Sequence, residues 1–291
     1  MNYEDRTRKY RNIVNDSLDT AMLLPDVPDT LKKAIRYSVE AGGKRIRPCL
    51  TLGVCDIMGG NRKMAIKLAC GIEMIHTYSL IHDDLPCMDD DDMRRGKPSN
   101  HKVFGEGQAV LAGDGLLTYA FYWMIEAGLG FEKPNYYRAV AEIARRAGVT
   151  GMVAGQSADL IGAQEGLKNE EELEYIHRHK TADMLIASVL AGAYCGSPTE
   201  IQLKSLEDYA EKIGILFQIT DDILDADEDE NAEENGVKKP KLTFVTMYGK
   251  EKAMQLARDT AKEAERILFN TFGENCRYLY DTIYYILERV N

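Results

Sequence analysis

The chain has 291 residues, 45% of them apolar, which suffices for one large core, and we expect residues 1–291 to form a single domain. Its formal net charge of −11 excludes a protein that binds nucleic acid through a basic face. Its six cysteines form neither a CxxC pair nor a disulfide-like framework, so we expect reduced thiols, as in the cytoplasm.

The sequence also indicates a cytoplasmic protein without a membrane span. Its first residues, MNYEDRTRKYRN, lack the apolar segment that a secretory signal needs. The uncharged stretch at 184–196 is too short to cross a bilayer.

The first predicted helix begins at Asp29 or Thr30 and ends at Gly42 and Gly43, a favourable pair for a C-terminal cap. The basic run KRIRP at 44–48 then forms a tight connection. Taken alone, such a run is an exposed turn. Because aspartate clusters follow later in the chain, we favour a phosphate-binding role, since Arg can hold two phosphate oxygens at once and Lys adds a point charge.

Residues 62–82 form a predicted helix that is apolar nearly all round, which places it in the core. His76 on this helix is by default a core histidine with a satisfied side chain. Ser79 lies one turn before Asp83 on nearly the same face, and Tyr78 flanks it.

The helix runs into HDDLPCMDDDDMRR at 82–95, which has six aspartates between Asp83 and Asp92. Carboxylates that close together form either a solvated acidic loop or a divalent-cation site. Asp83 and Asp89 are six residues apart, about 240° around an ideal helix, so they can converge only if the helix loosens between them. Pro86 provides a reason for the helix to loosen.

Further helices are predicted over residues 106–128 and from Pro134, whose pattern continues through a glycine-containing stretch at 148–155. Asn169 and Glu172 resemble a capping box. The apolar stripe that follows aims Lys180 inward, where a lysine often extends its apolar stem along the core.

A second aspartate cluster continues the apolar stripe of a long helix. Asp221 and Asp225, four residues apart, lie on the side that carries Leu206, Ile213 and Phe217. Carboxylates on a core-facing stripe need a metal or cationic partners to offset their desolvation. The segment after it, 226–242, is acidic and then basic and is the clearest predicted loop, and two closing helices follow at 244–269 and 276–289.

DDLPCMD at 83–89 and FQITDDILD at 217–225 resemble the two aspartate-rich motifs of the trans-isoprenyl diphosphate synthases, most closely the bacterial farnesyl diphosphate synthases. GGKRIRP at 42–48, IHTYSLIHDD at 75–84 and the pair Lys180-Thr181 match in the same order. The resemblance extends from about residue 28 to the end. It implies an all-α fold, a single-domain bundle of about ten or more helices around a central cavity.

The resemblance also assigns roles to single residues. It implies about three Mg²⁺ ions, with Mn²⁺ as an alternative, held by Asp83, Asp84, Asp89, Asp221, Asp222 and Asp225. It gives the isopentenyl diphosphate site to Lys44, Arg47, His76 and Arg95. The allylic diphosphate falls to Arg94, Lys180, Thr181, Gln218 and Lys241, of which the last four form the predicted catalytic set.

The implied reaction condenses isopentenyl diphosphate with dimethylallyl and geranyl diphosphate through an allylic carbocation and yields farnesyl diphosphate. Tyr78, with Ser79, would form the floor that stops chain growth. A geranylgeranyl diphosphate synthase is the alternative within the family. The family also implies a homodimer.

The sequence departs from the family after Lys241, because Thr243-Phe244-Val245 stands where a Thr-Tyr-Pro step is common. Arg289 near the end of the chain is a further candidate for closing the site.

Two readings outside this activity stay open. A terpene cyclase would ionise its substrate in a similar metal site but would incorporate no isopentenyl diphosphate. A noncatalytic partner subunit would keep the fold and lose ligands, whereas both aspartate motifs are present here. A histidine-aspartate metal hydrolase is disfavoured, because the chain has only five histidines.

Overall fold

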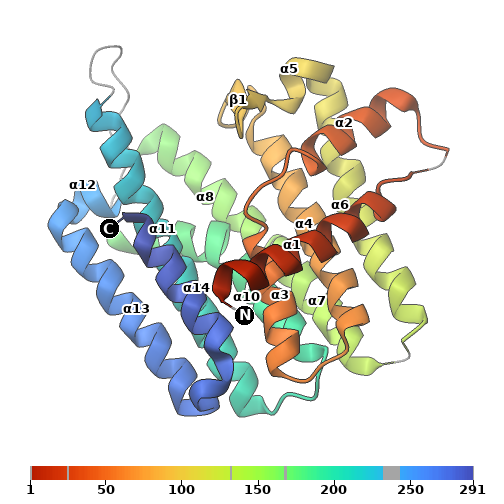
Figure 1. Ribbon diagram of the computed structural model, residues 1–291. Helices are drawn as coiled ribbons and strands as arrows, with labels where there is room; N and C mark the ends of the chain where they lie inside the picture. Colours follow the sequence, from red (N-terminus) through yellow and green to blue (C-terminus); the bar gives the residue numbers. More distant parts are fainter. Residues whose placement is uncertain (1, 25, 132, 167–168, 232–242, 291) are drawn as a thin grey trace. The chain divides into compact units, whose positions relative to one another are not determined.

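The computed structural model describes residues 2–24, 26–131, 133–166, 169–231 and 243–290, with backbone alone at 228–231. Most of these residues lie in α-helices, and the predicted all-α fold class is confirmed (Figure 1). The chain divides into two compact units, Met1–Ile143 with Ala191–Ser197, and Ala144–Leu190 with Pro198–Asn291. Each unit is described by itself, and the expectation of one domain over residues 1–291 stays a prediction.

The first unit contains seven α-helices and one short antiparallel hairpin among its described residues. In chain order these elements are α1 Tyr3–Ala21, α2 Asp29–Val39, α3 Ile46–Ile57, α4 Arg62–Asp83, β1 Met93–Arg94, β2 Lys97–Pro98, α5 Asn100–Phe104, α6 Glu106–Leu129 and α7 Pro134–Ala147, the last of which ends beyond Ile143. In the hairpin, Met93 pairs with Pro98 and Arg94 with Lys97.

The helix α4 is the centre of this unit, since α1, α3 and α6 all pack against it. Asn61 caps its first turn by accepting from the backbone of Lys63 at 3.0 Å. A glycine brings α6 close to α4, because a Cβ at Gly113 would lie 2.1 Å from the His82 ring. The prediction of an apolar core helix at 62–82 is therefore confirmed.

Among the described residues, α4 is the one helix whose length and apolar composition would allow it to cross a membrane. In this structure, 72% of its most apolar window is buried inside the protein. The core helix of a folded domain meets the same criteria, so this finding indicates packing within the unit. The sequence-based expectation considered only the stretch at 184–196, which is shorter.

The second unit is built around a single long helix, α11, which α12, α13, α14 and the π-helix η1 contact. Its elements are α8 Met152–Glu165, α9 Glu170–Ile176, η1 His177–Ala182, α10 Asp183–Tyr194, α11 Glu200–Asn231, α12 Phe244–Tyr248, α13 Lys250–Phe272, the 3-10 turn η2 Gly273–Cys276, α14 Arg277–Leu287 and the 3-10 turn η3 Glu288–Val290. The end of α10, from residue 191, belongs to the first unit.

Several sequence-based boundaries were wrong, and the first predicted helix already ends at Val39. The helix from Pro134 does not continue through 148–155, because the chain turns at 148–151 and α8 starts afresh at Met152. The predicted loop at 226–242 starts too early, since α11 continues to Asn231, and in the sequence the first helix-breaking residue after it is Gly236. The closing helix at 244–269 is interrupted at Gly249, whose φ is +81°.

Candidate active site

The first aspartate cluster lies where α4 ends and the chain turns. Asp83 is the last helical residue, and the amide of Asp89 donates to the carbonyl oxygen of Asp83 at 2.9 Å. The amide of Asp90 donates to Leu85 at 3.1 Å. These backbone hydrogen bonds bring Asp89 back to the end of α4. The predicted loosening of the helix between Asp83 and Asp89 is therefore confirmed.

Asp84 is buried, and Arg94 on the hairpin is its cationic partner. The Arg94 Nε lies 2.8 Å from the Asp84 carboxylate, and its Nη2 also reaches Asp91 at 3.0 Å. Burial raises the pKa of Asp84, and the nearby guanidinium of Arg94 works against that rise. The hairpin thus holds Arg94 against the aspartate loop.

The basic segment GGKRIRP is not a simple connection, which corrects the sequence-based boundary. α3 begins at Ile46, so Arg47 lies in its first turn, while Lys44 is exposed before it. Between them, Arg45 has a left-handed backbone, with φ at +52°, and points inward. Its guanidinium pairs with the buried Glu73 on α4 at 2.5 Å.

Arg95 and His76 lie beside this segment. Arg95 donates to the carbonyl oxygen of Gly42, and a Cβ at Gly43 would lie 2.7 Å from its guanidinium carbon. Burial, followed by the positive charges of Arg47 and Arg95, lowers the pKa of His76 well below its usual value. The structure therefore brings together Arg47, His76 and Arg95, three of the four residues predicted for isopentenyl diphosphate.

The predicted chain-length residues lie on the same helix. Tyr78 is buried, and its ring meets the His82 ring edge-on at 5.8 Å between centroids. Burial, with the charge of Asp83, raises the pKa of Tyr78 to about 12. Ser79 is half-buried, and its hydroxyl donates to the His76 carbonyl oxygen at 2.9 Å.

In the second unit, Lys180 and Thr181 lie on the π-helix η1, which the α-helical period did not predict. Two glycines of neighbouring helices pack against it. A Cβ at Gly155 on α8 would lie 2.1 Å from the Lys180 amide nitrogen, and one at Gly214 on α11 would lie 2.4 Å from the Ala182 Cβ. π-Helices are rare and are frequently found at functional sites, so this local geometry supports a role for the pair.

Lys180 is half-buried, and its ammonium lies 2.6 Å from the Asp159 carboxylate. The adjacent Thr181 hydroxyl donates to the Gln218 amide oxygen at 3.1 Å. Gln218 donates in turn to Asp222 at 3.1 Å. These contacts connect η1, α8 and α11, and they bring together three of the predicted allylic-site residues.

The three aspartates of the second cluster differ in burial: Asp222 is buried, Asp221 is half-buried and Asp225 is exposed. Asp222 is buried, and its other carboxylate oxygen accepts from the Phe244 amide at 2.9 Å. Asp221 pairs with Arg289 near the end of the chain at 2.7 Å. Asp225 is exposed on the last turns of α11. Lys241 lies outside the described residues.

All six predicted metal-binding side chains are carboxylates, the hard oxygen ligands that Mg²⁺ prefers. Each cluster already draws in a cation of the protein, Arg94 in the first unit and Arg289 in the second. Carboxylates in partly buried positions need nearby positive charge to offset their desolvation. The donor set therefore fits Mg²⁺ in each unit.

Sequence reasoning missed two features of these sites. One is the burial of Gln156 on α8, whose side-chain oxygen and nitrogen both lie buried without a hydrogen-bond partner among the described residues. A second group, Asp90, Asp92 and His101, gathers ligand atoms within 4.8 Å of one another. Its sequence signal is weak, since His101 follows nine residues after Asp92 with no periodic pattern.

The chain matches one protein family and is similar to curated sequences of that kind. The family model described as polyprenyl synthetase matches residues 28–279. The chain is 46% identical over 261 residues to the chloroplastic geranylgeranyl pyrophosphate synthase of Capsicum annuum, covering 88% of this chain and 70% of the relative. It is 48% identical over 266 residues to the chloroplastic geranylgeranyl pyrophosphate synthase 3 of Arabidopsis thaliana, covering 88% and 72%.

The fold is also similar to that of solved structures with related names. An apo FPP/GFPP synthase from Zymomonas mobilis matches with a TM-score of 0.89 and 33% identity, over 98% of this chain and 99% of that one. A geranyltransferase from Legionella pneumophila matches with a TM-score of 0.89 and 30% identity, over 99% and 97%.

Proposed function

This chain belongs to the polyprenyl synthetase family and is a prenyltransferase that acts on isoprenoid diphosphates, and we propose that its final product is geranylgeranyl diphosphate. The observation that carries the choice of product is the name of the two curated relatives given above, both of them geranylgeranyl pyrophosphate synthases. The substrates are isopentenyl diphosphate and the allylic dimethylallyl, geranyl and farnesyl diphosphates.

The isopentenyl diphosphate binds at the basic group of the first unit. Arg47 and Arg95 hold its diphosphate, and Lys44 adds a third positive charge. His76, kept neutral by its lowered pKa, donates a hydrogen bond without adding to the repulsion among the arginines. A bound diphosphate would relieve the repulsion among these cationic side chains, which favours its binding here.

In the second unit, Lys180, Thr181 and Gln218 are the residues we assign to the allylic diphosphate. The bond between its allylic carbon and the bridging oxygen breaks, and the electron pair leaves with the diphosphate. The ammonium of Lys180 stabilises the charge that develops on the departing oxygens. The double bond of isopentenyl diphosphate then attacks the allylic carbon, and the released diphosphate takes up the proton that is lost.

Mg²⁺ held by the carboxylates of each aspartate cluster would supply positive charge to a diphosphate bound beside that cluster. The arginines that pair with Asp84 and Asp221 keep those carboxylates oriented until a cation arrives. The protein supplies no nucleophile, so proximity and alignment of the two substrates account for much of the rate.

Farnesyl diphosphate is the second candidate product, and one observation favours it. Tyr78 is a bulky, buried residue five positions before Asp83 on α4. A floor of that size would stop the chain one isoprene unit earlier. If the floor lies deeper, the hydrocarbon passes Tyr78 and geranylgeranyl diphosphate results.

The test is product analysis with purified protein, Mg²⁺, labelled isopentenyl diphosphate and each allylic primer in turn. We expect geranylgeranyl diphosphate as the end product, also when farnesyl diphosphate is the primer. If products stop at farnesyl diphosphate and Tyr78→Ala lengthens them, the second candidate is correct. If folded protein incorporates no isopentenyl unit from any primer, both candidates are wrong.

Metal dependence is tested in the same assay. A chelator should abolish incorporation, and Mg²⁺ or Mn²⁺ should restore it. Activity that survives complete metal removal would refute the assignment of the aspartate clusters.

We also propose a cytoplasmic homodimer. Exposed apolar side chains on α6 support a second copy as the partner, among them Leu111, Tyr122, Ile125 and Leu129. Light scattering of the purified protein tests this, and a monomer at micromolar concentration would refute it.

A further inference from the structure

His101 on α5 is a buried histidine whose side chain has no polar partner. It is 6% exposed, and neither ring nitrogen makes a hydrogen bond with any residue that the structure describes. Burying an imidazole without partners for its nitrogens costs free energy, because the desolvation of these polar atoms is not compensated. Such a side chain therefore requires a ligand or another partner.

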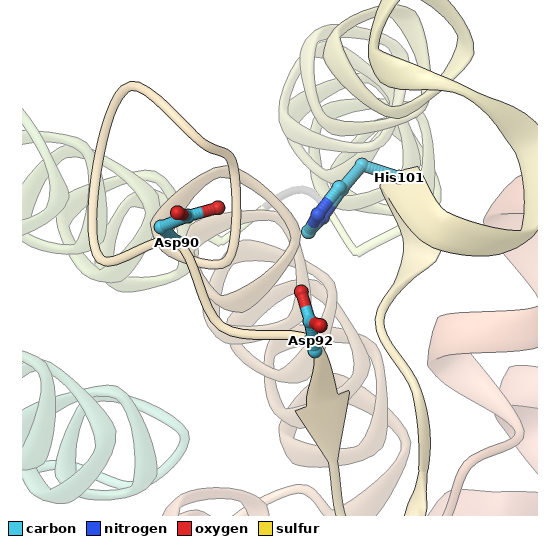
Figure 2. A group of neighbouring side chains, drawn as sticks. All are labelled: Asp90, Asp92 and His101. Atoms are coloured by element: carbon cyan, nitrogen blue, oxygen red, sulfur yellow. The ribbon is translucent and has the colours of Figure 1, made fainter. Parts of the chain in front are cut away.

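The ring points toward two carboxylates. Figure 2 shows His101 aimed at Asp92 and Asp90, which come from the other side of the group. One ligand atom from each of the three residues lies within 4.8 Å of the other two. Two exposed carboxylates alone would mean little, but here they converge on a buried nitrogen donor.

The backbone holds the three residues in this arrangement without a metal. The Ser99 amide donates to the Asp92 carbonyl oxygen at 2.9 Å, and its hydroxyl donates to the Asp91 carbonyl oxygen at 2.5 Å. The Asn100 side chain donates to Ala34 on α2 at 2.8 Å. These bonds fix the start of α5 against both the aspartate loop and the body of the first unit.

Lys102 is the existing cationic partner of this group. Its ammonium lies 2.6 Å from Asp92, but both side chains are largely exposed. An exposed ion pair contributes about 0–1 kcal/mol, so a bound cation could displace it easily. Asp90 makes no ion pair within 4 Å in the described part of the chain, and Figure 2 shows its carboxylate directed toward the group.

We propose that Asp90, Asp92 and His101 form a binding site for a divalent transition-metal ion such as Zn²⁺, distinct from the Mg²⁺ ligands Asp83, Asp84 and Asp89. An imidazole nitrogen selects Zn²⁺ and its neighbours over Mg²⁺, which prefers oxygen. Three protein ligands leave room for water on the ion. A bound ion ties the aspartate loop to α5 and so fixes the hairpin between them, which carries Arg94 and Arg95.

The experiment is a Zn²⁺ titration of the full-length protein in excess Mg²⁺, so that the oxygen-only sites are already filled. Histidine labelled with ¹⁵N in the ring reports metal binding directly, and the other four histidines are internal controls. We expect one ring nitrogen of His101 to shift with saturable binding. His101→Asn and Asp90→Asn should weaken Zn²⁺ affinity about tenfold or more.

Two further variants distinguish the loss of a metal ligand from a mere change of charge near the site. Asp91→Asn removes the same charge from the same loop outside the group, and it should change Zn²⁺ affinity by less than about threefold. Lys102→Gln removes the competing ammonium and should tighten binding. Because Asp90 is exposed, Asp90→Asn should fold normally even if His101→Asn does not.

The proposal is overturned if the His101 ring signals do not respond to Zn²⁺, or if Asp91→Asn weakens binding as much as Asp90→Asn. It does not depend on the reaction, since the readout is the histidine itself.

Discussion

Replacing Glu73 by Gln should destabilise the first unit strongly. Glu73 and Arg45 form an ion pair at 2.5 Å, and their side chains are only 2% and 3% exposed. Removing one charge leaves the other buried and uncompensated, which costs about 3–5 kcal/mol. Arg45 also donates to Asn15 at 3.2 Å and to the Val39 carbonyl oxygen at 2.6 Å, so the loss affects α1, α2 and α4 together.

This cost is a large part of the free energy of unfolding, which is about 5–15 kcal/mol for a typical protein. A loss of about 3 kcal/mol corresponds to a fall in Tm of about 6–12 °C for a protein of this size. Urea unfolding and thermal unfolding, both followed by circular dichroism, measure the change. Affinity for inorganic diphosphate should fall as well, because Lys44 and Arg47 flank Arg45 in the chain.

The control is an ion pair of the same chemistry on the surface. Lys204 and Asp208 lie 2.8 Å apart, with side chains 70% and 38% exposed. Asp208→Asn should cost about 0–1 kcal/mol. If Glu73→Gln also costs less than about 1 kcal/mol, the reasoning from burial is refuted.

The remaining predictions concern His76 and two glycines. By NMR, the pKa of His76 should lie well below its usual value of about 6.5 and should rise when diphosphate binds. Since only the unfolded chain then takes up this proton, the contribution of His76 to stability should decrease as pH falls below about 6.5. Gly155→Ala should lower kcat/KM for the allylic substrate about tenfold or more, because its Cβ would push η1 away at Lys180. Gly115→Ala on α6, whose Cβ would meet only Ile35 at 3.9 Å, should leave kcat/KM unchanged and add about 0.5–1 kcal/mol of stability. The account of His76 is contradicted if diphosphate binding does not change its pKa. The account of η1 is contradicted if Gly155→Ala and Gly115→Ala lower kcat/KM by the same factor.

The sequence was sufficient for the family and for those helices whose ends carry local signals. Asn169 caps α9 by accepting from Glu172 at 2.9 Å, and Thr199 and Gln202 cap α11 reciprocally, as their spacing predicts. Such caps involve residues three positions apart, so they are visible without the tertiary structure. The aspartate-rich motifs likewise identified the family, which the comparisons confirm.

What the sequence could not provide depends on contacts between distant segments. The π-helix forms where Gly155 and Gly214 allow two other helices to approach, and no local pattern within 177–182 predicts that. From the sequence, Arg45 resembles an exposed cation in a basic turn, because its partner Glu73 is 28 residues away and cannot be identified from the local pattern. His101 was overlooked because its relation to Asp90 and Asp92 is set by the hairpin between them, which was not predicted.

The π-helix also has a consequence for how this segment can vary. A π-turn contains one residue more than an α-turn, so η1 corresponds to an α-helix with a single inserted residue. Deleting one residue from 177–182 would restore a regular helix and rotate every preceding or following side chain by about 100°. Lys180 would then leave Asp159, or the buried Asp183 would leave Arg146 at 2.5 Å. A deletion within this stretch should therefore break one of these two ion pairs.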